Sequence, residues 1–254
     1  MADARSALET WAPTSRGDKK RPSASTACSI GNKAIEAWGT AGYANALLGR
    51  YDAALHVLER CVQRATENGL ATVHYLRHNV GYVLLAMGRF TEARAMLEGT
   101  LEPLAAHPHL LRGSQRYLAR ALVALGDLEG AERLALAALV SSEREIAVAA
   151  ARADMAHVLA ARGDLAEAKS LIEEAALGLT ADAGFDEDEL FIRLTLVVVR
   201  ARSGDRSGAR DAAQAGVARL AHLAAKISDP SARASFLQNV PEHRAIAKHL
   251  RRLE

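Results

Sequence analysis

A glycine followed five residues later by an alanine recurs five times along this chain, at nearly constant spacing. The intervals between successive glycines are 39, 38, 37 and 41 residues, for Gly49, Gly88, Gly126, Gly163 and Gly204. A period in this range is typical of repeat proteins, in which each repeat is one supersecondary unit that packs on its neighbours. Repeat proteins usually bind partners rather than catalyse reactions. The spacing therefore constrains both the fold and the class of function.

Each of these glycines lies between two segments with helical periodicity. In the segment Val80–Met87, for example, apolar residues recur at intervals of three and four. A glycine suits the position just past a helix C-terminus, where the left-handed conformation disfavours a Cβ atom. Downstream of three of the turns, Asp127, Asp164 and Asp205 are expected to cap the next helix. We therefore predict an all-α chain of five helix–turn–helix units.

The composition agrees with packed helices. Half of the 254 residues are apolar but only 4% are aromatic, a mixture that favours helices over sheets. The formal net charge of +2 does not indicate a nucleic-acid partner. No apolar run approaches the roughly 20 residues of a membrane helix, and residues 1–30 contain no signal-peptide core. We expect a soluble cytoplasmic protein, in which Cys28 and Cys61 remain reduced rather than forming a disulfide.

Three regions are predicted along the chain. Residues 1–29 are rich in Ser, Thr, Ala, Pro and basic residues, and we expect a flexible tail or, alternatively, a basic interaction arm. Residues 229–254 are expected to form two capping helices, because Asp229-Pro230 suits a helix start and Pro241 suits another. The residues between them hold the array, with repeats at about 30–68, 69–106, 107–141, 142–182 and 183–228.

The repeat units resemble tetratricopeptide repeats. The first unit carries the fullest match to the family's pattern, at Trp38, Gly42, Gly49, Tyr51, Ala54, Leu58 and Cys61. Later units place Gly81, Ala119 and Ala156 at the first small position, where helices about 8–10 Å apart need small residues. The fifth unit departs most, with Val197 and Arg206 at the small and aromatic positions. The resemblance implies a right-handed α-solenoid of about five antiparallel helix pairs.

The C-terminal segment carries a second resemblance. Residues 229–244 are similar to the terminal segment of large bacterial signalling proteins, in which a kinase or nucleotide-cyclase domain and an AAA-like (STAND) ATPase precede a repeat array. This resemblance implies a regulatory array, with a kinase or ATPase of the same system as one potential partner. The two helices would cover the exposed face of the last repeat, as a solenoid requires.

Motifs for catalysis, cofactors and metals are missing. The chain has no phosphate-binding loop, kinase catalytic loop, dinucleotide-binding glycine pattern or His-Glu-x-x-His motif. His74 and His78 have metal-compatible spacing but no obvious third ligand, and His107-Pro108-His109 suits an inter-repeat loop. The acidic residues 186–189 are explained by the dipole at a helix start. We predict no catalytic residues, no cofactor and no metal, with an unrecognised enzyme site as a remote alternative.

The resemblance implies that partners bind along the first helix of each pair. Residues at 13, 10, 6 and 3 positions before each turn glycine, with the residue at 9 beside them, share one helical face. Aromatic and basic residues gather on this face in the middle of the array, and such residues are enriched at binding hot spots. The predicted partner-binding residues are Tyr75, His78, Asn79, Tyr82, Arg116, Tyr117, Arg120 and His157.

We expect these residues to form a groove for a protein or peptide, in which the arginines hold an acidic group bidentately. The competing interpretation is that the tyrosines pack between helices and the arginines are solvated. The predicted function is a non-catalytic interaction scaffold or regulatory array of a bacterial signalling system. The alternative is a sensor that binds a small ligand or signalling peptide and changes its superhelical curvature.

Overall fold

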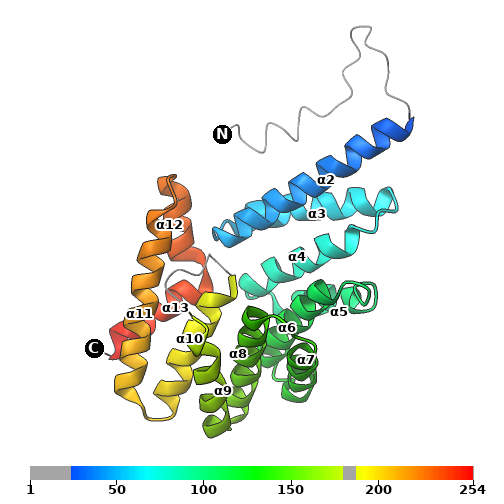
Figure 1. Ribbon diagram of the computed structural model, residues 1–254. Helices are drawn as coiled ribbons and strands as arrows, with labels where there is room; N and C mark the ends of the chain where they lie inside the picture. The colour runs from blue at the N-terminus through cyan, green and yellow to red at the C-terminus, as the bar shows by residue number, and fades with distance from the viewer. Residues whose placement is uncertain (1–23, 180–186, 254) are drawn as a thin grey trace. The chain divides into compact units, whose positions relative to one another are not determined.

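The computed structural model describes residues 24–179 and 187–253, so residues 1–23 of the predicted tail lie outside the described residues. The chain divides into two compact units, residues 1–34 and residues 35–254. All regular secondary structure in the described residues is helical (Figure 1). The predicted all-α solenoid is confirmed, and the larger unit contains the turns, the groove and the cap.

Ten of the described helices form five antiparallel pairs. The pairs are α2 (Ala24–Leu47) with α3 (Tyr51–Glu67), α4 (Val73–Ala86) with α5 (Phe90–Leu101), α6 (Pro108–Leu125) with α7 (Leu128–Val140), α8 (Glu145–Arg162) with α9 (Leu165–Leu177), and α10 (Glu187–Arg202) with α11 (Arg206–Ala225). Helix α2 begins at Ala24, so residues 24–29, expected to be part of the tail, are helical. No Gly or Pro interrupts this stretch, and the helix therefore extends upstream of its apolar pattern.

The five turn glycines adopt the backbone conformation expected from the spacing. Their φ angles are 70° at Gly49, 75° at Gly88, 83° at Gly126, 105° at Gly163 and 82° at Gly204. All five lie in the left-handed region, where a side chain is disfavoured. The recurrence of glycine therefore reflects a requirement of each turn.

The aspartates after the turns behave unequally. The carboxylates of Asp127 and Asp205 each accept a hydrogen bond of 2.9 Å from the backbone N–H three residues on, as predicted for helix caps. The prediction for Asp164 is wrong, because its side chain makes no cap bond and instead accepts from the Arg162 guanidinium. A charge-assisted bond of this kind competes directly with a neutral backbone donor.

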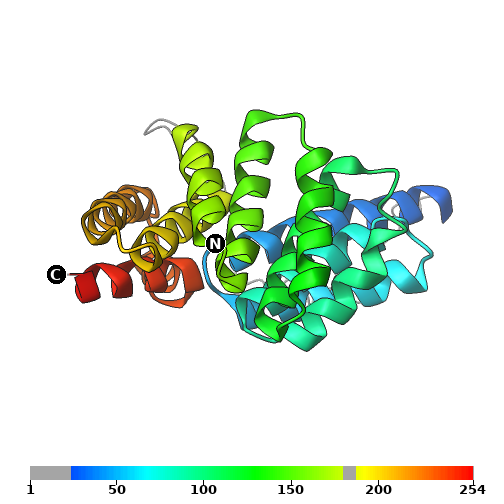
Figure 2. The ribbon, with the colours of Figure 1, turned by 90° about the horizontal axis from the view of Figure 1, so that it is seen from below.

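Small residues allow the two helices of a pair to approach closely. A Cβ atom added at Gly42 would lie 2.8 Å from Leu58, and one added at Gly81 would lie 2.5 Å from Leu97. Ala119 is buried at the corresponding place in the third pair. Successive pairs pack on one another, with α4, α6, α8 and α10 in contact as an inner layer. Figure 2 shows the green helices of the third and fourth pairs running side by side.

Two further helices, α12 (Pro230–Asn239) and α13 (Pro241–Leu253), form the cap. The Asp229 carboxylate accepts from the backbone N–H of Ala232 at 2.7 Å and thus begins α12. Helix α13 packs against α10 and α11 (Figure 1), so the cap covers the last repeat. The cap also contacts the first turn, because the Asn239 amide donates to the Gly49 carbonyl at 3.1 Å.

Candidate partner-binding groove

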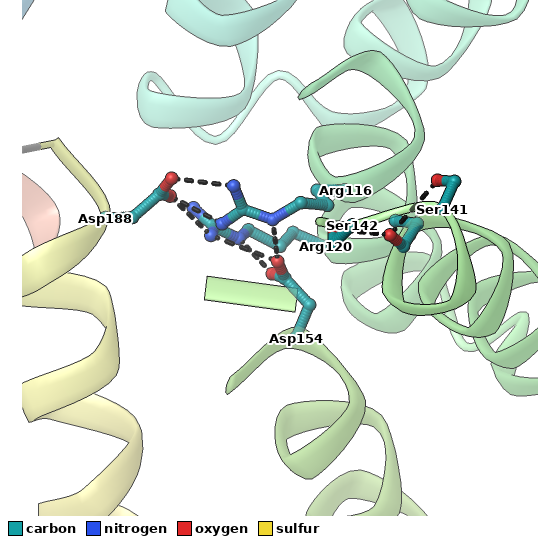
Figure 3. Close-up of polar contacts among 7 residues, drawn as sticks. Arg116, Arg120, Ser141, Ser142, Asp154 and Asp188 are labelled. Carbon is teal, nitrogen blue, oxygen red and sulfur yellow. Dashed lines mark hydrogen bonds and ion pairs between the residues drawn. The ribbon is translucent and has the colours of Figure 1, made fainter. Parts of the chain in front are cut away.

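Four charged side chains from three inner helices meet in a buried ion-pair network, which we call the quartet. It consists of Arg116 and Arg120 from α6, Asp154 from α8 and Asp188 from α10. Arg116 donates to both Asp188 oxygens at 2.6 Å and to Asp154 at 2.5 Å. Arg120 donates to Asp154 at 2.5 Å and to Asp188 at 3.0 Å. Figure 3 shows both guanidinium groups lying between the two carboxylates.

The quartet is neutral as a unit, since two guanidinium groups face two carboxylates. Burial by itself would raise the pKa of Asp188, but Arg116 and Arg120 hold it well below its ordinary value. The arginines were expected either to hold an acidic group of a partner or to be solvated. The structure corrects both expectations, because carboxylates of the chain itself already occupy them. A buried guanidinium left unpaired would be strongly destabilising.

Aromatic rings form a ladder along the inner layer. The rings of Tyr43 and Tyr82 have centroids 5.8 Å apart, and those of Tyr82 and Tyr117 are 5.1 Å apart. The Arg120 guanidinium carbon lies 5.6 Å from the Tyr117 centroid and 3.5 Å from that of Phe191, a cation–π geometry. The tyrosines therefore pack between helices, as the competing interpretation stated, while their edges still line the cavities described next.

One side of the quartet opens into a cavity of about 390 Å³, which we call the basic cavity. The residues that characterise its wall are Tyr75, Asn79, Arg112, Arg116, Arg144 and Asp188. Asn79 is only 2% exposed, and its side-chain nitrogen Nδ2 has no hydrogen-bond partner. Arg112 donates to the Ser141 carbonyl at 3.0 Å, and Arg144 forms no ion pair within the described part of the chain. Since the quartet is neutral, these two arginines make the cavity positive.

The other side holds a cavity of about 360 Å³, which we call the cap-side cavity. Its wall includes Tyr82, Phe90, Arg120, His157, Phe191 and Glu242. Burial lowers the pKa of His157 to about 4, so its imidazole is neutral at pH 7. Burial also raises the pKa of the Glu242 carboxyl above its ordinary value. Glu242 lies in the first turn of α13, so the cap forms part of this wall.

All eight residues selected from the sequence line one of these cavities. Tyr75, His78, Asn79, Arg116 and Tyr117 line the basic cavity, and Tyr82, Arg120 and His157 line the cap-side cavity. Sequence reasoning missed Glu242 and explained Asp188 only by the dipole at a helix start, whereas the structure pairs Asp188 with Arg116 and Arg120. Asp188 lies three residues before Phe191 on the same face of α10, so extending the face by one turn would have selected it.

The histidines considered as metal ligands have other surroundings. His78 hydrogen-bonds with the Ser114 hydroxyl at 2.8 Å, and burial lowers its pKa to about 4. Its ring stacks on Tyr117 with a centroid distance of 5.3 Å. No group of three or more potential metal ligands occurs among the residues that the structure describes. Within the same residues, no helix is long and apolar enough to cross a membrane.

Comparison with known sequences identifies the repeat type. Family models described as tetratricopeptide repeat match residues 35–68, 75–102, 113–137 and 149–174. The matched segments lie within the first four helix pairs. No curated protein matches the chain in sequence.

Comparison with solved structures gives similar folds. A Rap protein complexed with Competence and Sporulation Factor matches with a TM-score of 0.61 and 14% identity, over 85% of this chain and 72% of the Rap chain. A thermophilic tetratricopeptide-repeat protein of Thermus thermophilus matches with a TM-score of 0.58 and 20% identity, over 80% and 96% of the two chains. Kinesin light chain repeats of Podosopora anserina match with a TM-score of 0.53 and 21% identity, over 74% and 95%. At these identities the similarity concerns the fold.

Proposed function

Because tetratricopeptide-repeat models match segments of its first four helix pairs, we propose that this chain is a non-catalytic interaction protein whose inner face binds a peptide or an extended segment of a partner protein. Proteins built from these repeats are typically scaffolds rather than enzymes. The two cavities on either side of the quartet provide a binding groove. Its walls carry tyrosine and arginine, the residues enriched at binding hot spots.

The observation that carries this proposal is the unpartnered amide of Asn79. A buried donor without a hydrogen-bond partner costs about 1–3 kcal/mol, so its presence in a cavity wall needs a reason. A peptide carbonyl placed in the basic cavity would accept from Asn79 Nδ2 and recover that cost. The amide therefore favours a ligand with an exposed backbone.

The charge of the basic cavity favours an acidic group on the ligand. We assign its recognition to Arg112 and Arg144 rather than to Arg116 and Arg120, because the quartet already satisfies the latter pair. A carboxylate beside two guanidinium groups forms charge-assisted hydrogen bonds, which are stronger than neutral ones. The ligand class proposed for this cavity is therefore an acidic peptide segment.

The test is a peptide array followed by solution binding. Labelled protein is screened against short peptides that differ in charge, and the hits are measured by fluorescence anisotropy. Asn79→Ala is expected to weaken binding about tenfold, with folding checked by circular dichroism, because Nδ2 has no hydrogen-bond partner in the free protein and is available to the ligand. Arg144→Gln is expected to weaken binding less and to reduce its salt dependence.

The matched control is Arg152→Gln, which removes an arginine of α8 that pairs with Glu174 outside the cavity. Its binding is expected to equal that of the wild type. If the peptides selected in the screen bound the wild-type, Asn79→Ala and Arg144→Gln proteins with equal affinity, the proposal would be contradicted.

The alternative function is a sensor that changes curvature when a small ligand or signalling peptide binds. It is favoured by the quartet, which ties α6, α8 and α10 together at the point where both cavities meet. The Rap protein similar in fold to this chain is complexed with Competence and Sporulation Factor. A saturable thermal shift with one compound, together with a change in radius of gyration, would support the sensor. Binding without a change in radius would support the scaffold.

We further propose that the array serves a bacterial signalling system with a kinase or ATPase partner in the cytoplasm. This rests on the resemblance of residues 229–244 to the end of such proteins. An adjacent reading frame encoding a kinase or ATPase, whose product binds the purified chain, would support it. Neighbouring genes that encode no kinase or ATPase, together with no binding of the purified chain to such enzymes, would contradict the proposal.

A further inference from the structure

Glu242 is an acidic side chain of the groove that forms no ion pair with the described residues. The quartet balances two arginines with two aspartates, and Glu242 enters none of the ion pairs formed by the described residues. It is half-buried, because the cap places it at the wall shared by the cap-side cavity and a smaller neighbouring one. A backbone hydrogen bond supports the carboxylate there, but its charge has no cation beside it.

The groups that face Glu242 come from several helices. Arg120 of α6 is the nearest cationic influence, but its charge is committed to Asp154 and Asp188. Tyr82 of α4 lines the same two cavities, and the charge of Glu242 also influences Tyr51 of α3. These phenols are neutral at pH 7, since burial raises the pKa of each. Arg120 therefore favours the Glu242 carboxylate from a distance, but no cation of the described residues forms an ion pair with it.

At the mouth of the cavity the positive charge belongs to Arg244, which is exposed to water. Solvent screens such a charge, so it stabilises the Glu242 carboxylate only weakly. Burial raises the pKa of Glu242, which is the expected response of a carboxyl that lacks a close cation.

The rest of the wall suits an apolar stem that ends in a positive group. Leu85, Met87, Phe90 and Phe191 supply apolar surface. The cavity of about 360 Å³ is large enough to admit a long side chain. Phe191 already stacks with the Arg120 guanidinium at 3.5 Å, which shows that this ring can lie against a cation.

We propose that the cap-side cavity binds a basic side chain of the partner, a lysine or arginine, with the Glu242 carboxylate as its counter-ion and the apolar wall around its stem. The proposal extends the proposed function, since it gives the two cavities opposite preferences on the two sides of the neutral quartet. A bound peptide would place an acidic group toward Arg112 and Arg144 and a basic side chain toward Glu242. The groove would thereby fix the direction of the chain that it binds.

The experiment uses a small probe, so that it does not depend on knowing the partner. Binding of n-butylguanidinium to the full chain is measured by isothermal titration or by NMR shift titration, with n-butylurea as the uncharged probe of similar shape. The wild-type protein is expected to bind the guanidinium probe at least about tenfold more tightly than the urea, as a charge-assisted bond should exceed a neutral one. Equal binding of the two probes would overturn the proposal, because it would show that the charge is not recognised.

Two variants locate the site. Glu242→Gln keeps the size of the side chain and is expected to weaken n-butylguanidinium binding at least about tenfold, whereas the control Arg152→Gln, outside both cavities, leaves it unchanged. Ala124→Trp, at an exposed position of the cap-side wall, is expected to block the cavity while retaining Glu242. Unchanged binding in either Glu242→Gln or Ala124→Trp would overturn the proposal. Because Ala124→Trp does not touch the carboxyl, it also covers the case in which Glu242→Gln fails to fold.

The results of the probe and peptide experiments are separable. Binding of n-butylguanidinium that depends on Glu242, without any acidic peptide in the array, would support the cation site and contradict the peptide groove. Acidic peptides that need Asn79 but bind Glu242→Gln as well as the wild type would support the groove and overturn the cation site. Peptides that need both residues, and lose affinity when their basic residue is replaced, would support both.

Discussion

The inner and outer layers of the array share one repeat pattern but bury different chemistry. The outer helices α7 and α9 bury mainly Ala131, Ala135, Ala138, Ala168, Ile172 and Ala175. The inner helices α4, α6, α8 and α10 also bury polar and charged residues, namely His78, Asn79, Ser114, Arg116, Asp154, Asp188, Glu189 and Thr195. Small apolar side chains suffice to hold adjacent repeats together. In the inner layer, ion pairs between helices add a second means of holding the repeats together.

The two layers therefore differ in what is required when a side chain is buried. Burying an alanine requires only space, whereas burying a charge requires a partner at hydrogen-bond distance. Most of the buried inner charges have such partners, while among the described residues Asn79 Nδ2 has no hydrogen-bond partner and the Glu242 carboxyl has no ion pair. The inner layer thus combines a rigid, satisfied centre with unsatisfied groups at its two cavities. Those groups are where a ligand has most to contribute.

The largest effect is expected from breaking the quartet. Asp154→Ala should lower the free energy of unfolding by about 3–5 kcal/mol, because one carboxylate would then face two buried guanidinium groups. The measurement is equilibrium unfolding in urea. Glu132→Ala, which removes an exposed ion pair with Arg162, is the control and should cost about 0–1 kcal/mol. Equal losses in the two variants would show that the inner network does not differ energetically from a surface pair.

In the outer layer, Ile172→Ala should cost about 2–5 kcal/mol through lost apolar contact and the resulting cavity. Leu177 lies on the same helix but is 84% exposed, so Leu177→Ala should change stability by no more than about 0.5 kcal/mol. Both values come from thermal or urea unfolding. We also expect Ile172→Ala to leave the affinity for the selected peptides unchanged after correction for unfolded protein, which would show that binding depends on the inner layer and not on the outer one. A loss of affinity in the folded variant would contradict this.

Acid should destabilise the inner layer through its buried histidines. Burial lowers the pKa of His78 and of His157 to about 4, below the unfolded value of about 6.5. Between these pH values the unfolded chain binds more protons, so stability falls as pH falls, by about 1.4 kcal/mol per pH unit for each histidine. His157→Phe keeps a ring against Phe191 and should flatten the decline between about pH 6.5 and pH 4. Parallel curves for the variant and the wild type would contradict this account.

The smallest expected effect concerns the starts of the outer helices. Asp127→Ala should cost about 1 kcal/mol, because it removes the cap bond to the Gly130 N–H. Asp164→Ala removes only an exposed pair with Arg162 and should cost less, about 0–1 kcal/mol. Comparing the two by urea unfolding tests whether a cap seen in one repeat and missing from the next has a measurable consequence.

Much of the fold could be predicted because its determinants are local. Turn glycines, aspartate caps and the prolines at 230 and 241 act on backbone groups within a few residues of themselves. Asp164 shows the limit of this reasoning, since its carboxylate accepts a hydrogen bond from Arg162 instead of capping the helix. The sequence predicted part of the set of residues that line the two cavities, because helical periodicity places residues on one face without saying what they contact.

The sequence by itself determined the repeat, the helix pairs, the glycine turns and the face that became the inner layer. Only the tertiary structure decided that Arg116 pairs with Asp188, 72 residues away, and that Asn239 of the cap reaches Gly49, 190 residues away. The physical reason is that such contacts depend on the rotation between successive helix pairs, which accumulates along the array. A period fixes the unit that is repeated, whereas the stacking of units decides which distant charges meet and which, like Glu242, are left without a partner.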